Sequence, residues 1–320
     1  MATTHEVPKA ILYSWKGSVW CSVPRLALVE KGYGDDEIVI KSVNITEGDQ
    51  FTPAFLRLNP HGTVPTLVVP LERSLGPDEE SQFRALRDSV AITDFIDQSR
   101  SPLSKTHTTS SAPAPSLSPA TMEGSNTSKA IISLLHDPKG ADPNFLKRSA
   151  RVPAEITQGA KVIVPLFEAR QRVLDASLAE QPEGMSSKLR TFLEGKSAQN
   201  KIMLDIWSRG AASPAAAEFM ESSKTLWELA LPDTLKKLNE LIVGPFCLGD
   251  QLSVADLHVA AWLARVVSVC GGSAKPEDLA KVEEKIGLPG FKIGEKIKTY
   301  WAAMIVRPSF KTVYPGGVLH

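Results

Sequence analysis

The most specific candidate binding element is the segment 59–65, Asn-Pro-His-Gly-Thr-Val-Pro. Proline cannot donate to a sheet ladder, so Pro65 at the entry of the apolar run 66–71 is unusual. A cis bond between Val64 and Pro65 would turn the Val64 backbone N–H and C=O outward, where an extended peptide could pair with them. The alternative is a turn followed by an edge strand that binds nothing.

A second polar group, Arg87-Asp88-Ser89, follows at the boundary between a predicted strand and a predicted helix. The Asp88 carboxylate could hold an ammonium group. The Ser89 hydroxyl and the free N–H groups of a helix start could hold a carboxylate. Together they would bind the α-amino-acid end of a ligand. Asp and Ser are also favoured N-cap residues, so helix capping explains the same pattern, and both roles are compatible.

Short strands and helices alternate over residues 1–100, the first predicted domain. Pro24 should bend or delay the start of the first helix, because it lacks a backbone donor. The acidic stretch 74–82 contains Gly76-Pro77 and is typical of a surface loop. The predicted strands cover 10–13, 37–43, 66–71 and 83–86, and the predicted helices cover 25–31, 52–58 and 89–98. Their order, βαβαββα, is that of an α/β thioredoxin-like domain.

Residues 101–128 consist mainly of Ser, Thr, Pro and Ala, which predicts a mobile, low-complexity linker. Residues 129–320 are expected to form an all-α domain. Its apolar stripes predict helices over 158–180, 186–209, 215–241 and 253–269. Ser253 and Asp256 fit a capping box at the start of the last helix, which we interpret as structural.

The overall composition narrows the function classes. The 320 residues carry 36 basic and 36 acidic side chains, so the net charge gives no reason to expect nucleic acid or an anionic membrane as partner. The three cysteines lack metal-ligand spacing, and their use suits a reducing compartment. We expect no metal, no membrane span and a cytoplasmic location.

Taken in order, these motifs resemble those of the cytosolic glutathione transferases, and the chain is similar to a Ser-type, fungal-like member with two insertions. The resemblance covers most of the chain outside those insertions. It implies a thioredoxin-like domain followed by an all-α helical bundle, a homodimer, glutathione as co-substrate without a further cofactor, and a role in detoxification. The segments that carry it are 13–28, 53–58, 59–67, 87–89, 249–263 and 307–310.

The resemblance also implies roles for single residues in binding glutathione. Val64, between Thr63 and Pro65, would bind the cysteinyl backbone, and Asp88 with Ser89 would bind the γ-glutamyl end. Plant-type relatives hold the glycyl carboxylate with His-Lys, where this chain has Gln50 and Phe51. Gln50 can donate only a neutral hydrogen bond, so weaker glutathione binding is expected. His61 is a further, weaker candidate.

Matching residues 25–28 to the family places Ser18 at the catalytic hydroxyl, with Ser14 and Cys21 as alternatives. The hydroxyl would donate a hydrogen bond to the glutathione sulfur and favour the thiolate. Lowering a thiol pKa from about 8.5 by about two units requires roughly 2.7 kcal/mol. A hydrogen bond to a charged group supplies about 1.5–3 kcal/mol, and a helix N-terminus adds roughly 0.3–1 kcal/mol. No base is needed, because a thiolate is already nucleophilic.

Tyr13 is discounted, because a shift of one residue in a strand points its ring to the other face. The implied activity is conjugation of the glutathione thiolate to an apolar electrophile. A non-catalytic ligand carrier or regulator, and an ether-cleaving or thiol-transfer enzyme, remain alternatives. The apolar substrate would lie between the domains, near Trp15, Trp20 and the helix 158–180.

Overall fold

The computed structural model describes residues 9–70, 83–101, 110–180 and 186–320, so the predicted acidic loop 74–82 lies outside the described residues. The N-terminal part has the predicted order βαβαββα, which confirms the thioredoxin-like fold. Its sheet has the strand order β2-β1-β3-β4; β1 pairs with β2 in parallel, and the other two pairs are antiparallel. The elements are β1 (Ala10–Ser14), α1 (Val19–Glu30), β2 (Ile38–Ser42), a 3-10 turn η1 (Asp49–Phe51), α2 (Pro53–Leu58), β3 (Thr66–Pro70), β4 (Phe83–Leu86) and α3 (Ser89–Ser99).

Helix α1 starts earlier than the sequence predicts. It begins at Val19 instead of 25, and Pro24 lies inside it. The first four N–H groups of a helix have no partner within it, so a proline just beyond the first turn removes only one hydrogen bond. Buried side chains on both sides of Pro24, including Val23 and Leu26, pack into the main core and hold the helix in place.

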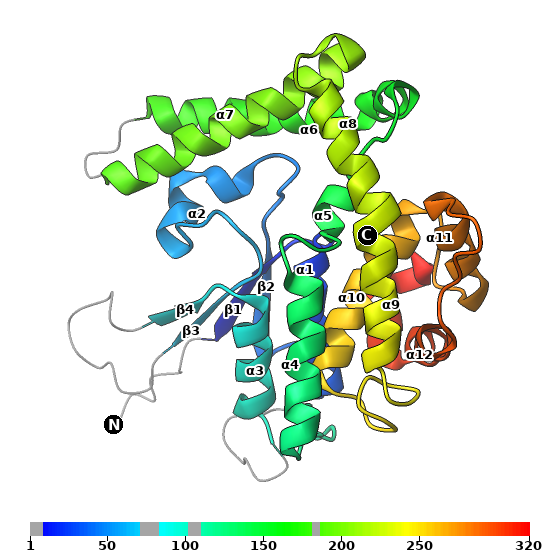
Figure 1. Cartoon of the computed structure of the whole chain (residues 1–320). Helices are drawn as coiled ribbons and strands as arrows, with labels where there is room; N and C mark the ends of the chain where they lie inside the picture. Colours follow the sequence, from blue (N-terminus) through cyan, green and yellow to red (C-terminus); the bar gives the residue numbers. More distant parts are fainter. Residues whose placement is uncertain (1–8, 71–82, 102–109, 181–185) are drawn as a thin grey trace, which may run out of the picture.

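The C-terminal part is helical, as predicted, and α10 passes through its centre (Figure 1). Every residue of α10 from Val254 to Val267 is buried, so the helix is enclosed on all sides. The helices are α4 (Met122–His136), α5 (Pro143–Leu146), α6 (Pro153–Ala179), α7 (Ser187–Arg209), α8 (Ala216–Thr225), a π-helical turn (Leu226–Ala230), α9 (Leu231–Leu241), α10 (Val254–Val269), α11 (Leu279–Ile286), α12 (Glu295–Ile305) and α13 (Pro308–Val313).

A capping box starts α10. The Asp256 carboxylate accepts hydrogen bonds from the Ser253 backbone N–H and hydroxyl, each at 2.7 Å, and from the backbone N–H of Cys247 at 2.7 Å. Asp256 therefore joins the helix start to the preceding loop, which is the structural role we expected of this pair.

The predicted linker 101–128 differs most from expectation. Residues 102–109 lie outside the described residues, but the part from 110 onward is fixed, and the helical region begins at Met122 instead of 129. Asp97 accepts hydrogen bonds from the backbone N–H groups of Leu117 and Ser118, both at 2.9 Å. The Lys31 ammonium donates to the carbonyl of Pro115 at 2.8 Å. Lys31, at the end of α1, and Asp97, on α3, thus form hydrogen bonds with backbone groups of this segment. These bonds hold a segment whose own side chains bury little apolar surface.

Helices α6 and α7 form a long antiparallel hairpin that lies across α2 (Figure 1). The end of α6 and the start of α7 pack on the sheet domain through a small apolar cluster of Phe51, Leu56, Leu174 and Leu193. The Ser177 hydroxyl also donates to the carbonyl of Phe51 at 2.9 Å. The hairpin is therefore anchored to the loop between β2 and α2.

Gly48 allows the close approach of this hairpin. Its φ is 89°, in the left-handed region, and an added Cβ would lie 3.2 Å from the Cα of Arg170 and from Val173. A residue with a side chain would be strained there and would push against α6. Among the described residues, no helix is long and apolar enough to cross a membrane.

Candidate functional site

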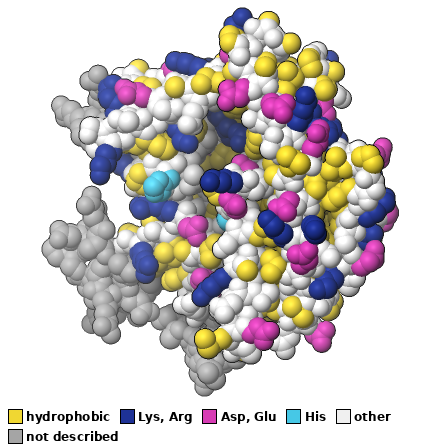
Figure 2. Space-filling model, viewed as in Figure 1, with side chains coloured by type: hydrophobic (Ala, Val, Ile, Leu, Met, Phe, Trp, Pro, Cys, Tyr) yellow, Lys and Arg dark blue, Asp and Glu magenta, His cyan; other side chains and the backbone are white. Residues whose placement is uncertain are grey.

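A cleft of about 340 Å³ lies between the sheet domain and the helical part. In the space-filling view, a hollow opens below the α6–α7 hairpin, with Lys and Arg atoms inside it (Figure 2). The sheet domain contributes Ser18, Trp20, Ile45, Gln50, Gly62, Thr63, Val64, Pro65, Arg87, Asp88 and Ser89 to the cleft, and the helical part contributes His136, Asn144, Arg148 and Arg170. Four separate segments of the sheet domain, at residues 18, 50, 63–65 and 88–89, therefore bring the predicted residues to one place.

The turn before β3 presents Val64 to the cleft. The Val64–Pro65 bond is cis, as predicted. The fully buried Asn59 holds the turn: its Nδ2 donates to the Thr63 carbonyl at 2.8 Å and to the Thr66 hydroxyl at 3.0 Å. Neither the N–H nor the C=O of Val64 forms a hydrogen bond with any described residue. Both groups are thus available to an extended peptide.

Asp88 and Ser89 lie at the start of α3. Asp88 is the N-cap, and its Oδ1 accepts from the N–H groups of Val90 and Ala91, both at 3.0 Å. Capping thus occupies one carboxylate oxygen, while Oδ2 forms no hydrogen bond with the described residues. Because Asp88 is exposed and Ser89 also lines the cleft, capping leaves Asp88 free to contact a ligand.

Of the three candidate catalytic groups, Ser18 is the one that lines the described cleft. It is the N-cap residue of α1, yet its hydroxyl forms no capping hydrogen bond. Ser14 is buried, and its hydroxyl has no partner among the described residues. The geometry thus favours Ser18 over Ser14.

Cys21 is fully buried beneath Ser18. Its Sγ accepts a hydrogen bond from the Trp15 N–H at 3.4 Å. Burial raises the pKa of the Cys21 thiol, and neighbouring hydrogen bonds from Ser18 and Trp15 only partly oppose this. The thiol therefore stays protonated at neutral pH and is enclosed, which disfavours it as a nucleophile.

Of Gln50 and Phe51, the two residues that stand in place of a charged pair, only Gln50 lines the cleft. Gln50 is buried and lines the cleft, and its Oε1 has no hydrogen-bond partner among the described residues. Phe51 points into the apolar cluster beneath the α6–α7 hairpin. His61 is exposed and does not line the cleft, so its expected contribution has no support from the geometry.

The helical part adds four cleft residues that the sequence did not single out: His136, Asn144, Arg148 and Arg170. One signal was present for Arg170, which follows Phe167 by three positions and precedes Leu174 by four on the buried side of α6. A cation at such a position is unusual in an apolar stripe. Of the two tryptophans proposed for the second substrate, Trp20 lines the cleft and Trp15 does not.

His136 connects the cleft to the core. Its ring stacks on Trp20 with 3.9 Å between centroids, and its Nε2 lies 2.9 Å from Nδ1 of the buried His258. Burial lowers the pKa of His136, although the charge of Asp88 opposes the shift. The pKa of His258 is lowered further by complete burial and by His136. Both imidazoles are therefore neutral at neutral pH, and their hydrogen bond fixes the Trp20 side of the cleft.

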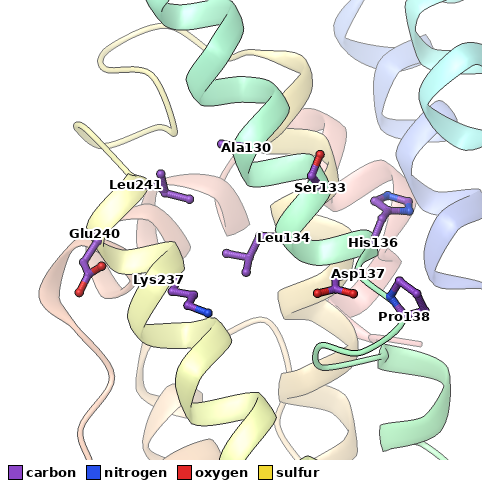
Figure 3. A pocket seen from close by; sticks show the side chains of 9 residues that line it. All are labelled: Ala130, Ser133, Leu134, His136, Asp137, Pro138, Lys237, Glu240 and Leu241. Atoms are coloured by element: carbon purple, nitrogen blue, oxygen red, sulfur yellow. The ribbon is translucent and has the colours of Figure 1, made fainter.

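A larger open groove of about 850 Å³ lies between α4 and α9 (Figure 3). Leu134 and Leu241 form an apolar wall, and Lys237 and Glu240 project from α9 beside it. The groove shares only His136 with the cleft and contains none of the residues predicted to bind a ligand. No group of three or more His, Cys, Asp or Glu side chains suited to a metal occurs among the described residues. The smaller cleft is the better candidate site.

Comparison with known proteins identifies the N-terminal part. Residues 12–104 match the family model of the glutathione S-transferase N-terminal domain. A glutathione S-transferase of the zeta class from Euphorbia esula is 49% identical over 61 residues, which is 19% of this chain and 26% of that protein. The match therefore spans about a quarter of the relative's length.

Two solved structures share the fold over nearly the whole chain. The beta-etherase LigF from Sphingobium sp. strain SYK-6 superposes with a TM-score of 0.56 at 14% identity, covering 96% of this chain and 99% of that one. Glutathione transferase F7 from Populus trichocarpa gives a TM-score of 0.50 at 18% identity, covering 97% and 100%. The family match thus covers the N-terminal part of the chain, and the two solved structures show that nearly the whole chain shares their fold.

Proposed function

We propose that the chain is a glutathione transferase that binds glutathione in the cleft between its two parts and transfers its thiolate to an electrophilic carbon. The observation that carries the proposal is the convergence of Ser18, Val64 and Asp88, from three separate segments, on one cleft. The free backbone groups of Val64 suit the cysteinyl part of the tripeptide. Asp88 and Ser89 suit the ammonium and carboxylate of the γ-glutamyl end.

In this proposal Ser18 stabilises the thiolate. The thiol proton leaves to solvent, and the Ser18 hydroxyl donates a hydrogen bond to the sulfur anion. The start of α1 adds favourable electrostatics, because its first N–H groups lie beside Ser18. The sulfur lone pair then forms the new bond to carbon while the leaving group departs with its electron pair. Trp20 would provide an apolar wall for the electrophile.

Two alternatives are weaker. A thiol-transfer reaction through a protein cysteine is disfavoured, because Cys21 is fully buried and burial raises its pKa. Ether cleavage, the activity named for the beta-etherase with the same fold, would use the same attack on a carbon that carries an aryloxide. It needs no additional protein group, so it is a substrate choice within the proposed chemistry.

The proposal is tested by calorimetric titration with glutathione, followed by a conjugation assay on the same sample with a nitro-activated aryl chloride and an aryl ether. Binding with turnover on either electrophile supports transfer, and the better substrate identifies the leaving group. Binding without turnover across a panel of electrophiles would favour a ligand carrier or regulator. Absence of binding at millimolar glutathione would contradict the proposal.

A further inference from the structure

Two arginines of the helical part, Arg148 and Arg170, line the cleft without an acidic partner. Arg148 lies just after α5, and its Nε donates to the Asn144 carbonyl at 3.1 Å. Arg170 lies on α6, and its Nε donates to the Ile45 carbonyl at 2.8 Å. Neither guanidinium forms an ion pair with a described carboxylate, and their terminal nitrogens have no hydrogen-bond partner among the described residues. Each guanidinium has five N–H donors, so most of them are unused.

This arrangement is costly without a ligand. Burial, together with the neighbouring charge of Arg148, lowers the pKa of Arg170 to about 10. Burial likewise lowers the pKa of Arg148. Two like charges that are partly removed from water and unpaired destabilise each other. An anion between them would relieve both the desolvation and the repulsion, and a planar carboxylate matches the fork of a guanidinium.

The contact of Arg170 with Ile45 indicates which end of the cleft it serves. Ile45 lies on the loop between β2 and α2, which also carries Gln50. By the resemblance drawn from the sequence, Gln50 stands at the position that would face the glycyl carboxylate. The α6–α7 hairpin thus brings a cation to the end of the cleft that lacks one in the N-terminal sequence, and Gly48 permits the close contact.

We propose that Arg148 and Arg170 form a carboxylate-binding subsite that the helical part adds to the cleft. The carboxylate could belong to the glycyl end of glutathione or to the acceptor substrate, and the contact of Arg170 with the loop that carries Gln50 favours the glycyl end. The inference rests on the proposed function, since it takes the cleft to be a glutathione site. It revises the expectation of weak glutathione binding drawn from Gln50 and Phe51.

The test compares glutathione with its glycyl ethyl ester, which lacks that carboxylate. Calorimetry is run on the full chain and on Arg170→Gln, Arg148→Gln and Arg170→Lys. Arg172→Gln is the matched control, because Arg172 is exposed on the same helix and does not line the cleft. The unaltered chain should bind glutathione about 10- to 100-fold more tightly than the ester, as loss of a charged hydrogen bond predicts. Arg170→Gln should remove this preference by weakening glutathione alone, and Arg170→Lys should keep part of it.

The remaining outcomes show whether the carboxylate belongs to glutathione or to the acceptor substrate. They also distinguish failure of the arginine subsite from failure of the proposed function. The unaltered chain could instead bind glutathione and its ester alike, while either Gln variant raises KM for a carboxylated electrophile more than for the methyl ester of that electrophile. In that case the acceptor substrate supplies the carboxylate, and the subsite is supported. If both Gln variants match Arg172→Gln on all four ligands while the unaltered chain binds glutathione, the subsite is wrong and the proposed function survives. If the unaltered chain binds neither glutathione nor its ester, both fail.

Discussion

Ser18 and Cys21 illustrate how the environment decides which of two neighbouring polar side chains can react. They are three residues apart and both lie at the first turn of α1. The Ser18 hydroxyl borders the cleft and is not used as a cap, whereas the Cys21 thiol is enclosed by apolar groups that raise its pKa. The intrinsically better nucleophile of the pair is thus the less available one, which is consistent with a chemistry in which the thiolate belongs to the ligand.

Replacing Ser18 by Ala should lower kcat for conjugation while leaving glutathione affinity nearly unchanged. The expected loss is about 10- to 100-fold, the equivalent of one hydrogen bond to a charged group. Steady-state kinetics and calorimetry on the same samples measure both quantities. Ser14→Ala is the matched control, because Ser14 is buried nearby but does not line the cleft, and its activity should change by less than about threefold. An equal loss in both variants would contradict the assignment of Ser18.

Asp88 allows its capping role to be separated from ligand binding. Asn is as good an N-cap as Asp, so Asp88→Asn should leave thermal stability nearly unchanged. It removes the charge that would hold the γ-glutamyl ammonium, so glutathione affinity should fall about tenfold. Asp88→Ala should show the same loss of affinity and, in addition, lose about 1 kcal/mol of stability. If Asp88→Asn bound glutathione normally, the carboxylate would be only a helix cap.

At the scale of elements, the α6–α7 hairpin is the feature that distinguishes this cleft. It closes over the loop between β2 and α2 through the cluster of Phe51, Leu56, Leu174 and Leu193. The same contact carries Arg170 to the cleft. An apolar interface outside the cleft therefore determines where a charged group inside it lies.

Gly48→Ala should weaken this interface. The substituted residue would have to adopt a φ of 89° or move α6, whose Arg170 Cα would lie 3.2 Å from the new Cβ. A left-handed residue with a side chain costs about 1–2 kcal/mol. Thermal unfolding should show a loss of that size, and glutathione affinity should fall with it. Gly195→Ala is the control, because nothing lies within 4 Å of a Cβ at that helical position, and it should be neutral or stabilising. Unchanged stability and affinity in Gly48→Ala would contradict the role given to this contact.

On the scale of the whole molecule, the segment from 110 to 121 ties the two parts together. Its central link is the buried ion pair between Lys31 and Asp97, with Nζ and Oδ1 2.8 Å apart. The same two side chains bind the backbone of Pro115, Leu117 and Ser118. Side chains of the sheet domain thus hold the segment between the two parts in place.

Asp97→Asn should destabilise the protein by about 3–5 kcal/mol at neutral pH, because it leaves Lys31 buried without its counter-charge. Burial alone would raise the pKa of Asp97, but Lys31, Ser118 and Leu117 outweigh it, so the folded pKa lies below its ordinary value of 3.8. A lowered carboxyl pKa stabilises the fold above the unfolded pKa, and this contribution is lost as pH falls through the folded value.

The difference between Asp97→Asn and the unaltered chain should therefore narrow in acid. Urea unfolding at pH 7 and about pH 3 measures it. Asp35→Asn, at an exposed site on a loop, should change stability by less than about 0.5 kcal/mol at either pH. A difference that stays constant with pH would contradict the assignment of the charged pair.

The sequence predicted those features whose cause is local. The cleft-lining turn with Pro65, the cap at Asp88 and the box at Ser253 each depend on residues within a few positions of one another, and the structure contains all three. The order of strands and helices followed from short apolar runs in the same way. Local patterns of this kind fix the sheet domain and one wall of the cleft.

Features that depend on distant contacts were missed. Arg170 reaches the cleft because the α6–α7 hairpin packs on a loop more than a hundred residues earlier in the chain. Arg148 reaches it from the segment between α5 and α6. The start of α1 and the order of the segment after 110 depend on packing partners and on the side chains of Lys31 and Asp97. Composition alone indicated a linker there, because its own residues bury little apolar surface.

The most direct test of the central claim is a pH titration of the thiolate absorbance of glutathione bound to the protein, with Ser18→Ala in parallel. The account predicts that the bound thiol titrates about two pH units below its free value of about 8.5, and that Ser18→Ala moves the midpoint back toward that value. A bound thiol that titrates at the free value in the unaltered chain would contradict thiolate activation by this cleft. The same midpoint in both proteins would contradict the role of Ser18.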